Sequence, residues 1–174
     1  MDKVAIFCSA SQLIPDSFND AASKVVKGLC SKGYGVVSGG TVLGTMGVVS
    51  RSAAECGGYH KGVLPRFMEN LASGSLSETV FTETMALRKE EMRRDTVAVL
   101  ALPGGIGTLD ELIETHVLKK LGCYHGRVIL LDLDGFFQPF LALLDHYVKT
   151  GMMTRDDRAL VESFDSVDSL LSSF

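Results

Sequence analysis

The sequence contains no apolar segment long enough to cross a bilayer. Its longest apolar run, Val97–Leu102, has six residues, whereas a membrane-spanning helix needs about 20. The first residues, Met1–Cys8, lack the apolar core of roughly 7–15 residues that marks a signal peptide. We therefore expect a cytoplasmic protein that has no membrane partner.

The chain also lacks an excess of basic residues. It carries 17 Lys and Arg against 21 Asp and Glu, a net charge of −4. A general nucleic-acid binder needs a basic face, so nucleic acid is excluded as a partner. An anionic ligand would need a local positive feature.

Metal-binding and disulfide patterns are missing too. The four cysteines have no CxxC spacing, and the four histidines have no HxxxH or HExxH spacing. We predict buried, reduced thiols and no metal site. The residues concerned are Cys8, Cys30, Cys56, Cys123, His60, His116, His125 and His146.

Short apolar runs alternate along the whole chain with apolar residues at helical spacing, as in Phe18–Leu29, Leu109–Val117 and Phe136–Val148. The runs are apolar on both faces, which is typical of parallel strands covered by helices. Residues 1–174 are therefore predicted to form one α/β domain with a Rossmann-like, doubly wound parallel sheet. The predicted strands are Val4–Cys8, Val36–Ser38, Gly62–Leu64, Val80–Phe81, Val97–Leu102 and Val128–Leu133.

Glycine is abundant, at 18 of 174 residues, and it clusters in two segments. Each segment follows a predicted strand and opens a predicted helix: the first glycine loop (Ser38–Gly47) and the second glycine loop (Leu102–Glu111). Glycine lets a backbone approach a ligand closely, and free N–H groups at a helix start attract anions. Neither loop is G-x-G-x-x-G or a P-loop, so two such loops indicate an anion site of another kind.

Thr108 and Glu111 have the spacing of a capping box, in which both side chains bond N–H groups of the first helical turn. From spacing alone, capping is the better interpretation for Glu111, while Thr108 is expected to cap and also to face a phosphate. Upstream, residues 84–95 predict a helix with a Glu90–Arg94 pair. Arg88 shares one helix face with two methionines, Met85 and Met92, and so needs an anionic partner.

Three basic neighbours, Lys89, Arg93 and Arg94, are expected on the solvated side of that helix.

Two segments taken together resemble a known family. Met85–Lys89 followed by Pro103–Glu111 is similar to the M-x-x-R-K … P-G-G-x-G-T-x-x-E signature of the Lonely Guy family. Its members are cytokinin riboside 5′-monophosphate phosphoribohydrolases, long labelled possible lysine decarboxylases. The resemblance covers nearly the whole chain. It implies a Rossmann-like nucleotide-monophosphate-binding domain, a homodimer, and cleavage of the N-glycosidic bond of an N6-modified adenosine monophosphate or AMP.

The resemblance also implies roles for individual residues. Arg88 and Glu111 fall on the family's catalytic arginine and glutamate. The substrate-binding positions, with the glycines and Thr108 holding the phosphate, are Ser9, Gly39, Gly40, Met85, Lys89, Gly104, Gly105, Gly107 and Thr108.

Some residues depart from the family pattern. Thr41 and Thr45 replace a glycine and a leucine of the first glycine loop, and Leu118 and Lys120 stand where a tryptophan and a glutamine are usual. The segment Cys123–Arg127 lacks the usual Lys-Pro. With these departures, the resemblance implies that the phosphate and ribose end of the site is retained and that recognition of the base differs from the family's.

The chemistry of such a site needs no cofactor. Glycoside cleavage passes through a cation of oxocarbenium character, which a carboxylate such as Glu111 stabilises while it orients water. Arg88 cannot be a general acid, because a guanidinium does not release its proton near neutral pH. The alternative function is a non-catalytic carrier of a phosphorylated ligand, and a decarboxylase would require a pyridoxal phosphate lysine, for which Lys89 is the one candidate near the motif.

Overall fold

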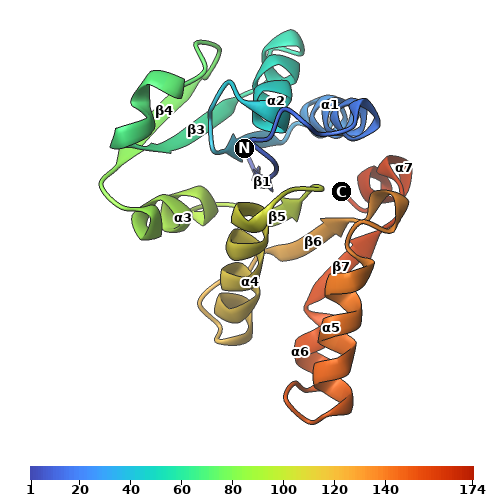
Figure 1. The fold of residues 1–174 in the computed structure, drawn as a ribbon. Coiled ribbons are helices and arrows are strands. Elements are labelled where there is room, and N and C mark those ends of the chain that lie inside the picture. Colours follow the sequence, from blue (N-terminus) through green and yellow to red (C-terminus); the bar gives the residue numbers. More distant parts are fainter.

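The computed structural model describes residues 1–174. Seven parallel strands form a single sheet in the order β4-β3-β2-β1-β5-β6-β7 (Figure 1). The predicted fold class is confirmed. The strands are β1 (Lys3–Phe7), β2 (Gly35–Ser38), β3 (His60–Pro65), β4 (Glu78–Thr82), β5 (Ala98–Ala101), β6 (Arg127–Leu131) and β7 (Val161–Phe164).

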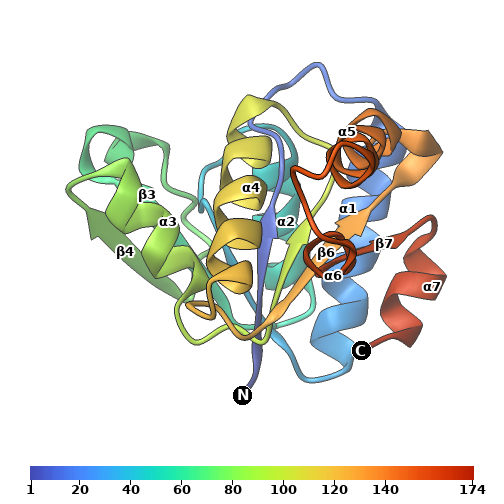
Figure 2. The same cartoon turned by 90° about the horizontal axis from the view of Figure 1, so that it is seen from below.

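Helices cover both faces of the sheet (Figures 1 and 2). One face carries α1 (Asp16–Ser31), α2 (Gly44–Glu55) and α7 (Val167–Ser172). The other carries α3 (Met85–Arg93), α4 (Ile106–Lys120), α5 (Gln138–Lys149) and α6 (Arg155–Ala159). Two short 3₁₀ helices, η1 (Arg66–Leu71) and η2 (Leu133–Gly135), follow β3 and β6. None of the helices is long and apolar enough to cross a membrane.

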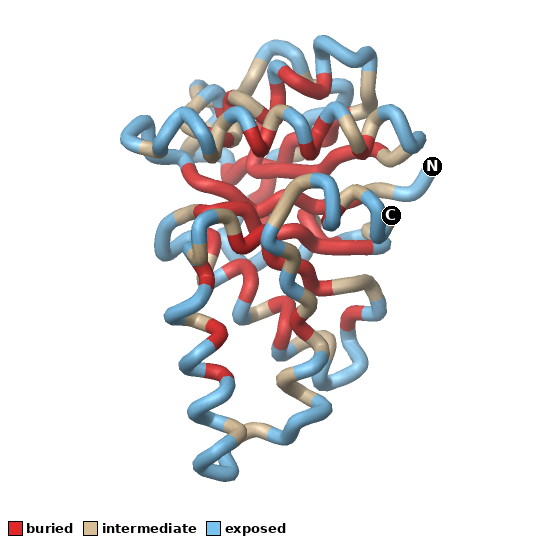
Figure 3. The backbone as a smooth tube through the Cα atoms, turned by 90° about the vertical axis from the view of Figure 1, so that its right-hand side faces the viewer, coloured by how far each residue is buried: buried red, intermediate tan, exposed pale blue.

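Alternate residues of the central strands enter two separate cores. In β1, Val4 and Ile6 pack on the α1 side, while Ala5 and Phe7 pack on the α4 side. Figure 3 shows the buried residues concentrated in the sheet between the helical layers. Because side chains point to opposite faces in turn, a strand covered on both sides must be apolar throughout, which explains the continuous apolar runs.

The edge strand β7 was not predicted from the sequence. Because Val161–Phe164 are only partly buried, polar side chains are tolerated there, and the segment has no apolar run by which to recognise a strand. At the other edge, β3 and β4 extend beyond the predicted Gly62–Leu64 and Val80–Phe81. The residues added are His60, Lys61 and Pro65 in β3, and Glu78, Thr79 and Thr82 in β4. Backbone pairing, which does not depend on side-chain polarity, supplies these extra residues.

Strand order reverses between β1 and β5, which pair in parallel. In open α/β sheets a crevice forms at such a point, beyond the carboxyl ends of the strands. The segment after β1 begins at Cys8, and the second glycine loop follows β5. Figure 2 shows α4 standing beside β1.

The prediction that all four thiols are buried holds in full only for Cys8, since Cys30 is half-buried. All four cysteines are free, but Cys56 and Cys123 are exposed. Both come directly after a helix, Cys56 as the C-cap of α2 and Cys123 beyond the end of α4, where the chain turns at the surface.

Candidate active site

A cavity of about 290 Å³ opens where strand order reverses. It brings together the segment after β1, the start of α2, the middle of α3 and the start of α4. The lining residues are Cys8, Ser9, Ala10, Ser11, Met46, Arg88, Gly105, Gly107, Thr108 and Glu111.

A buried ion pair forms one side of this cavity. Arg88 Nη1 donates a hydrogen bond to Glu111 Oε1 at 2.8 Å, and both side chains are 9% exposed. Arg88 Nε donates to the carbonyl of Val63 in β3 at 3.0 Å. The guanidinium is thus fixed from two directions. Glu111 is the anionic partner that Arg88 was predicted to need.

Glu111 does not form a capping box, so that interpretation is wrong. Helix α4 begins at Ile106 with Gly105 as its N-cap, and no side chain caps it. Thr108 is therefore the third helical residue and Glu111 the sixth. Their side chains line the cavity, and the first N–H groups of α4 have no helical acceptor.

Two opposing effects act on the Glu111 carboxyl. Burial raises its pKa above the usual 4.5, and the neighbouring Arg88 guanidinium offsets part of that rise. Burial also raises the pKa of the Cys8 thiol, which lines the same cavity, with a further contribution from the Glu111 charge. The cavity lining therefore includes a neutral thiol and a carboxylate held by a fixed cation.

The first glycine loop lies behind Arg88. A Cβ on Gly39 would overlap Arg88 Nη2. Gly40 has φ of +68°, and a Cβ there would lie 2.7 Å from the Cα of Gly62. These two glycines make room for the protein's own atoms and do not line the cavity.

The second glycine loop has the opposite character. A Cβ on Gly105 or on Gly107 would meet no atom within 4 Å, and both residues line the cavity. Gly104 lies outside the lining and accommodates the side chain of Thr108, whose Oγ1 a Cβ there would overlap.

Other predicted substrate-binding residues are placed differently from one another. Ser9 lines the cavity, and its Oγ accepts the N–H of Ser11 at 3.0 Å. Lys89 lies outside the lining, because its ammonium is bound by Asp110 and Glu114 of α4. Met85 also lies outside the lining and is 44% exposed.

The two threonines that depart from the family pattern stabilise the local structure. Thr41 Oγ1 accepts the N–H of Leu43, and Thr45 Oγ1 donates to Asn19 at 2.9 Å. Neither lines the cavity.

Sequence reasoning missed four lining residues: Cys8, Ala10, Ser11 and Met46. The first three follow β1 directly. The rule that ligands bind after the strands at the switch point would have found them, had the strand order been known.

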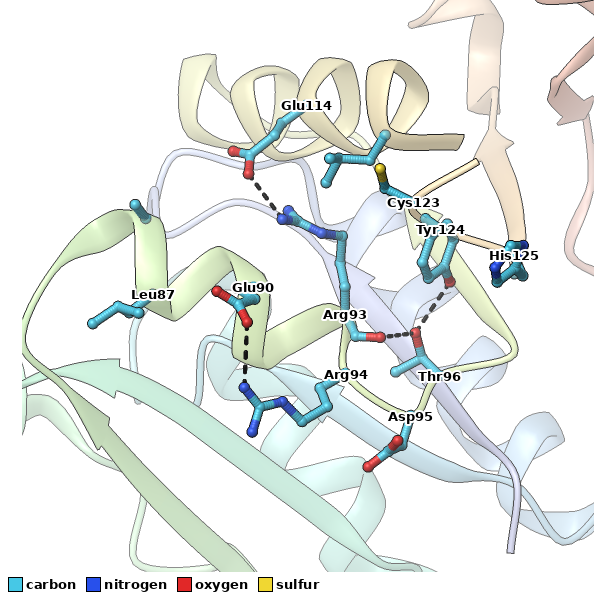
Figure 4. Close-up of a pocket in the computed structure, with 13 residues that line it drawn as sticks. Leu87, Glu90, Arg93, Arg94, Asp95, Thr96, Glu114, Cys123, Tyr124 and His125 are labelled. Carbon is cyan, nitrogen blue, oxygen red and sulfur yellow. Dashed lines mark hydrogen bonds and ion pairs between the residues drawn. The ribbon is translucent and has the colours of Figure 1, made fainter. Parts of the chain in front are cut away.

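A larger hollow, of about 660 Å³, lies between α3 and the end of α4 (Figure 4). Arg93 reaches across it to Glu114 at 2.8 Å, and Arg94 contacts Glu90.

The expectation that Arg93 is solvated is wrong, since only 7% of its side chain is exposed. Lys89, at 15%, is also mostly covered, and only Arg94 is well exposed. Ion pairs with carboxylates of α4 hold the side chains of Arg93 and Lys89 away from solvent.

This geometry defines a class: a single Rossmann-like domain with a cavity at its switch point, walled by a buried Arg–Glu pair and an uncapped helix start. Residues 46–174 match the sequence model of a family described as "possible lysine decarboxylase". The chain belongs to that family, the Lonely Guy family.

Curated relatives are similar over nearly the whole chain. The probable cytokinin riboside 5′-monophosphate phosphoribohydrolase LOGL3 of Oryza sativa subsp. japonica is 33% identical over 171 residues, 97% of this chain and 81% of that protein. The cytokinin riboside 5′-monophosphate phosphoribohydrolase LOG2 of Arabidopsis thaliana is 31% identical, covering 97% and 80%. These names support a phosphoribohydrolase at the level of the family.

Solved structures share the fold. The molybdenum cofactor carrier protein of Chlamydomonas reinhardtii superposes with a TM-score of 0.76 at 20% identity, covering 99% of this chain and 96% of that one. The molybdenum cofactor binding protein of Rippkaea orientalis gives 0.75 at 19%, covering 99% and 94%. At these identities the likeness concerns architecture alone.

Proposed function

We propose that this protein hydrolyses the N-glycosidic bond of an adenosine 5′-monophosphate, N6-modified or plain, to free base and ribose 5-phosphate. The observation that carries the proposal is the Arg88–Glu111 pair, buried beside a cavity that also exposes an uncapped helix start. The family relatives support the same reaction class.

Glu111 is the residue we assign to the reacting bond. As C1′–N9 breaks, positive charge develops on the ribose, and a carboxylate beside it stabilises that charge. Glu111 also orients a water molecule, accepts one of its protons as the oxygen attacks C1′, and then releases that proton to solvent. The departing base takes up one proton, so that one water is consumed for each bond cleaved.

Arg88 supplies a fixed positive charge. A guanidinium does not release its proton near neutral pH, so it acts by electrostatics. Its contacts with the Val63 carbonyl and with Glu111 hold it in place before substrate arrives. In this position it holds the phosphate or the ribose, or it stabilises negative charge on the departing purine.

The start of α4 is the proposed phosphate site. Gly105, Gly107 and Thr108 line the cavity there. The helix N-terminus carries an effective charge of about +0.5, and its free N–H groups point at the ligand. Binding energy from the phosphate then places C1′ near Glu111.

Lysine decarboxylation, the activity in the family's older description, does not suit Lys89. A lysine that forms a Schiff base needs a lowered pKa. Hydrogen bonding to Glu114 raises the pKa of Lys89 instead, and Asp110 adds to the effect. The ammonium is held in the charged form, which is not nucleophilic.

The deciding experiment compares kcat/KM for AMP, isopentenyl-AMP and their nucleosides, with free base and ribose 5-phosphate measured by chromatography. We expect cleavage of both monophosphates, a strong preference for them over the nucleosides, and weaker discrimination between the bases. Nucleosides cleaved as fast as monophosphates would contradict the phosphate site.

Glu111→Gln tests the catalytic assignment. We expect activity to fall at least about 10²-fold, as for loss of an acid–base or charge-stabilising group. Glu114→Gln is the matched control, because Glu114 lies on the same helix and pairs with Lys89 and Arg93 away from the cavity. A Glu111→Gln variant with normal turnover would refute the role. Nucleotide binding without any base release by the wild type would favour the carrier alternative.

We also propose that the protein is a homodimer formed through α4. Ile113, Val117 and Leu121 follow one another at four-residue spacing and are 43%, 48% and 64% exposed. An apolar stripe of this kind on a two-fold axis can pack against its own copy. Light scattering should give twice the chain mass for the wild type and the monomer mass for Val117→Glu. Leu143→Glu, at an exposed site on α5, is the control.

A further inference from the structure

His60 is a buried histidine whose single side-chain partner lies at the base of the first glycine loop. His60 begins β3, and its side chain is almost fully buried. Its Nε2 lies 2.8 Å from Ser38 Oγ, which ends β2. Its Nδ1 is buried with no partner. Burying an imidazole with one unsatisfied nitrogen costs free energy, which an apolar side chain in the same space would not. The presence of His60 and its bond to Ser38 therefore call for an explanation.

The Ser38 hydroxyl connects this histidine to the turn of the loop. Ser38 Oγ accepts the N–H of Gly40 at 3.1 Å. Gly40, with φ of +68°, rests on the Cα of Gly62, the residue paired with Ser38 across the two strands. The carbonyl of Gly40 accepts the N–H of Ser73 at 2.8 Å. The turn is therefore held by a side-chain hydroxyl on one side, and on the other by backbone bonds to residues 71–73, which include Val42 N–H to the carbonyl of Leu71.

The same turn packs against Arg88. Gly39, between Ser38 and Gly40, lies so close to Arg88 Nη2 that a Cβ would overlap it. The other side of this guanidinium binds Glu111. A displaced turn would free Arg88 to move away from Glu111.

We propose that His60 is a positioning residue, which acts through the Ser38 hydroxyl and the Gly39–Gly40 turn to hold Arg88 against Glu111. The proposal rests on the function proposed above, because Arg88 and Glu111 act on substrate only there. His60 itself touches neither the cavity nor its lining polar groups.

The test compares variants of the two partners. His60→Leu keeps the volume and removes the hydrogen bond, Ser38→Ala removes the hydroxyl, and His60→Gln keeps a polar nitrogen at the place of Nε2. We expect kcat for the monophosphate to fall about tenfold in His60→Leu and Ser38→Ala, with KM changed less. His60→Gln should recover most of the loss.

His116→Leu controls for the mere loss of a buried histidine. His116 is also buried, and its Nε2 contacts the carbonyl of Asp157 away from the cavity. We expect it to lower Tm as His60→Leu does, with kcat within twofold of wild type. Equal kcat losses in the two leucine variants, or no recovery in His60→Gln, would overturn the proposal. If His60→Leu does not fold, Ser38→Ala decides, and a normal kcat there would refute it.

Amide exchange separates this proposal from the proposed function. Exchange of the Gly40 N–H, followed by NMR, should be at least about tenfold faster in Ser38→Ala and His60→Leu than in His116→Leu, because its acceptor is lost or displaced. This readout holds even if the wild type cleaves no nucleotide. Unchanged exchange at Gly40 in His60→Leu would show that His60 does not hold the turn.

Discussion

The two glycine loops look alike in sequence, yet their glycines face different neighbours. In the first glycine loop, Gly39 and Gly40 press against Arg88 and Gly62, atoms of the protein itself. In the second glycine loop, Gly105 and Gly107 have no atom within 4 Å of where a Cβ would be, and they line the cavity. Gly39 and Gly40 make close packing possible, whereas Gly105 and Gly107 leave backbone open to a ligand.

Because of this difference, substitutions of the glycines in the two loops should affect different properties, folding stability in the first loop and ligand binding in the second. An added methyl group in the first glycine loop must displace protein atoms, so it should lower the free energy of unfolding. An added methyl group at Gly105 or Gly107 of the second displaces only solvent or ligand. Substitutions at the two loops should therefore change different measurements.

Gly40→Ala should have the largest effect. The left-handed φ of +68° costs about 1–2 kcal/mol for alanine, and contact with the Cα of Gly62 adds about 1–3 kcal/mol of overpacking. We expect the free energy of unfolding in urea to fall by about 4 kcal/mol. Gly33→Ala is the control, with φ of +84° and open space, and should lose only the backbone part. Equal losses would remove the packing distinction.

Lowering the pH should destabilise the protein through His60, which binds Ser38 at the base of the first glycine loop. Burial lowers the pKa of His60 from 6.5 to about 4, and no charged group contributes. The unfolded chain therefore binds one more proton between these values, so stability is lost as pH falls from 6.5 towards 4. The full loss is about 3 kcal/mol. Urea unfolding across this range should show it in the wild type. His60→Gln should flatten the curve, and an unchanged slope there would assign the loss to other groups.

Arg88→Lys removes the planar fork against which Gly39 rests. Lysine keeps the charge but cannot bond Val63 and Glu111 at once as the guanidinium does. We expect kcat/KM to fall about 100-fold, equivalent to about 2.7 kcal/mol. Arg93→Lys, on the same helix and paired with Glu114, should stay within about threefold. Wild-type kinetics in Arg88→Lys would leave Arg88 with a packing role only.

Gly107→Ala should have the smallest effect, with folding stability improved and substrate binding weakened. In helix α4 alanine stabilises by about 0.5–1 kcal/mol over glycine, while its methyl group enters the cavity and raises KM for the monophosphate. Gly74→Ala, also in open space but outside the cavity, should leave KM unchanged. A Gly107→Ala variant with raised stability and normal KM would show that the phosphate does not approach this residue.

Much of this protein is determined by local sequence. Apolar runs buried on both faces give the central strands, helical spacing gives α1, α4 and α5, and the glycine loops mark the strand-to-helix turns at the cavity. Arg88 also stood out, because a cation among methionines requires an anion. These inferences succeed because they depend on residues a few positions apart.

Only the tertiary structure decided which residues meet. Glu111 has the spacing of a cap, but α4 begins one turn earlier than a cap would need, at Ile106, which turns Glu111 towards Arg88, 23 residues away. The α4 carboxylate Glu114 draws Arg93 out of solvent, and backbone pairing at the sheet edge adds β7. Spacing along the chain fixes the face of a helix that a side chain occupies. A partner distant in sequence is set by the packing of one element on another, because such an ion pair forms only where two elements meet.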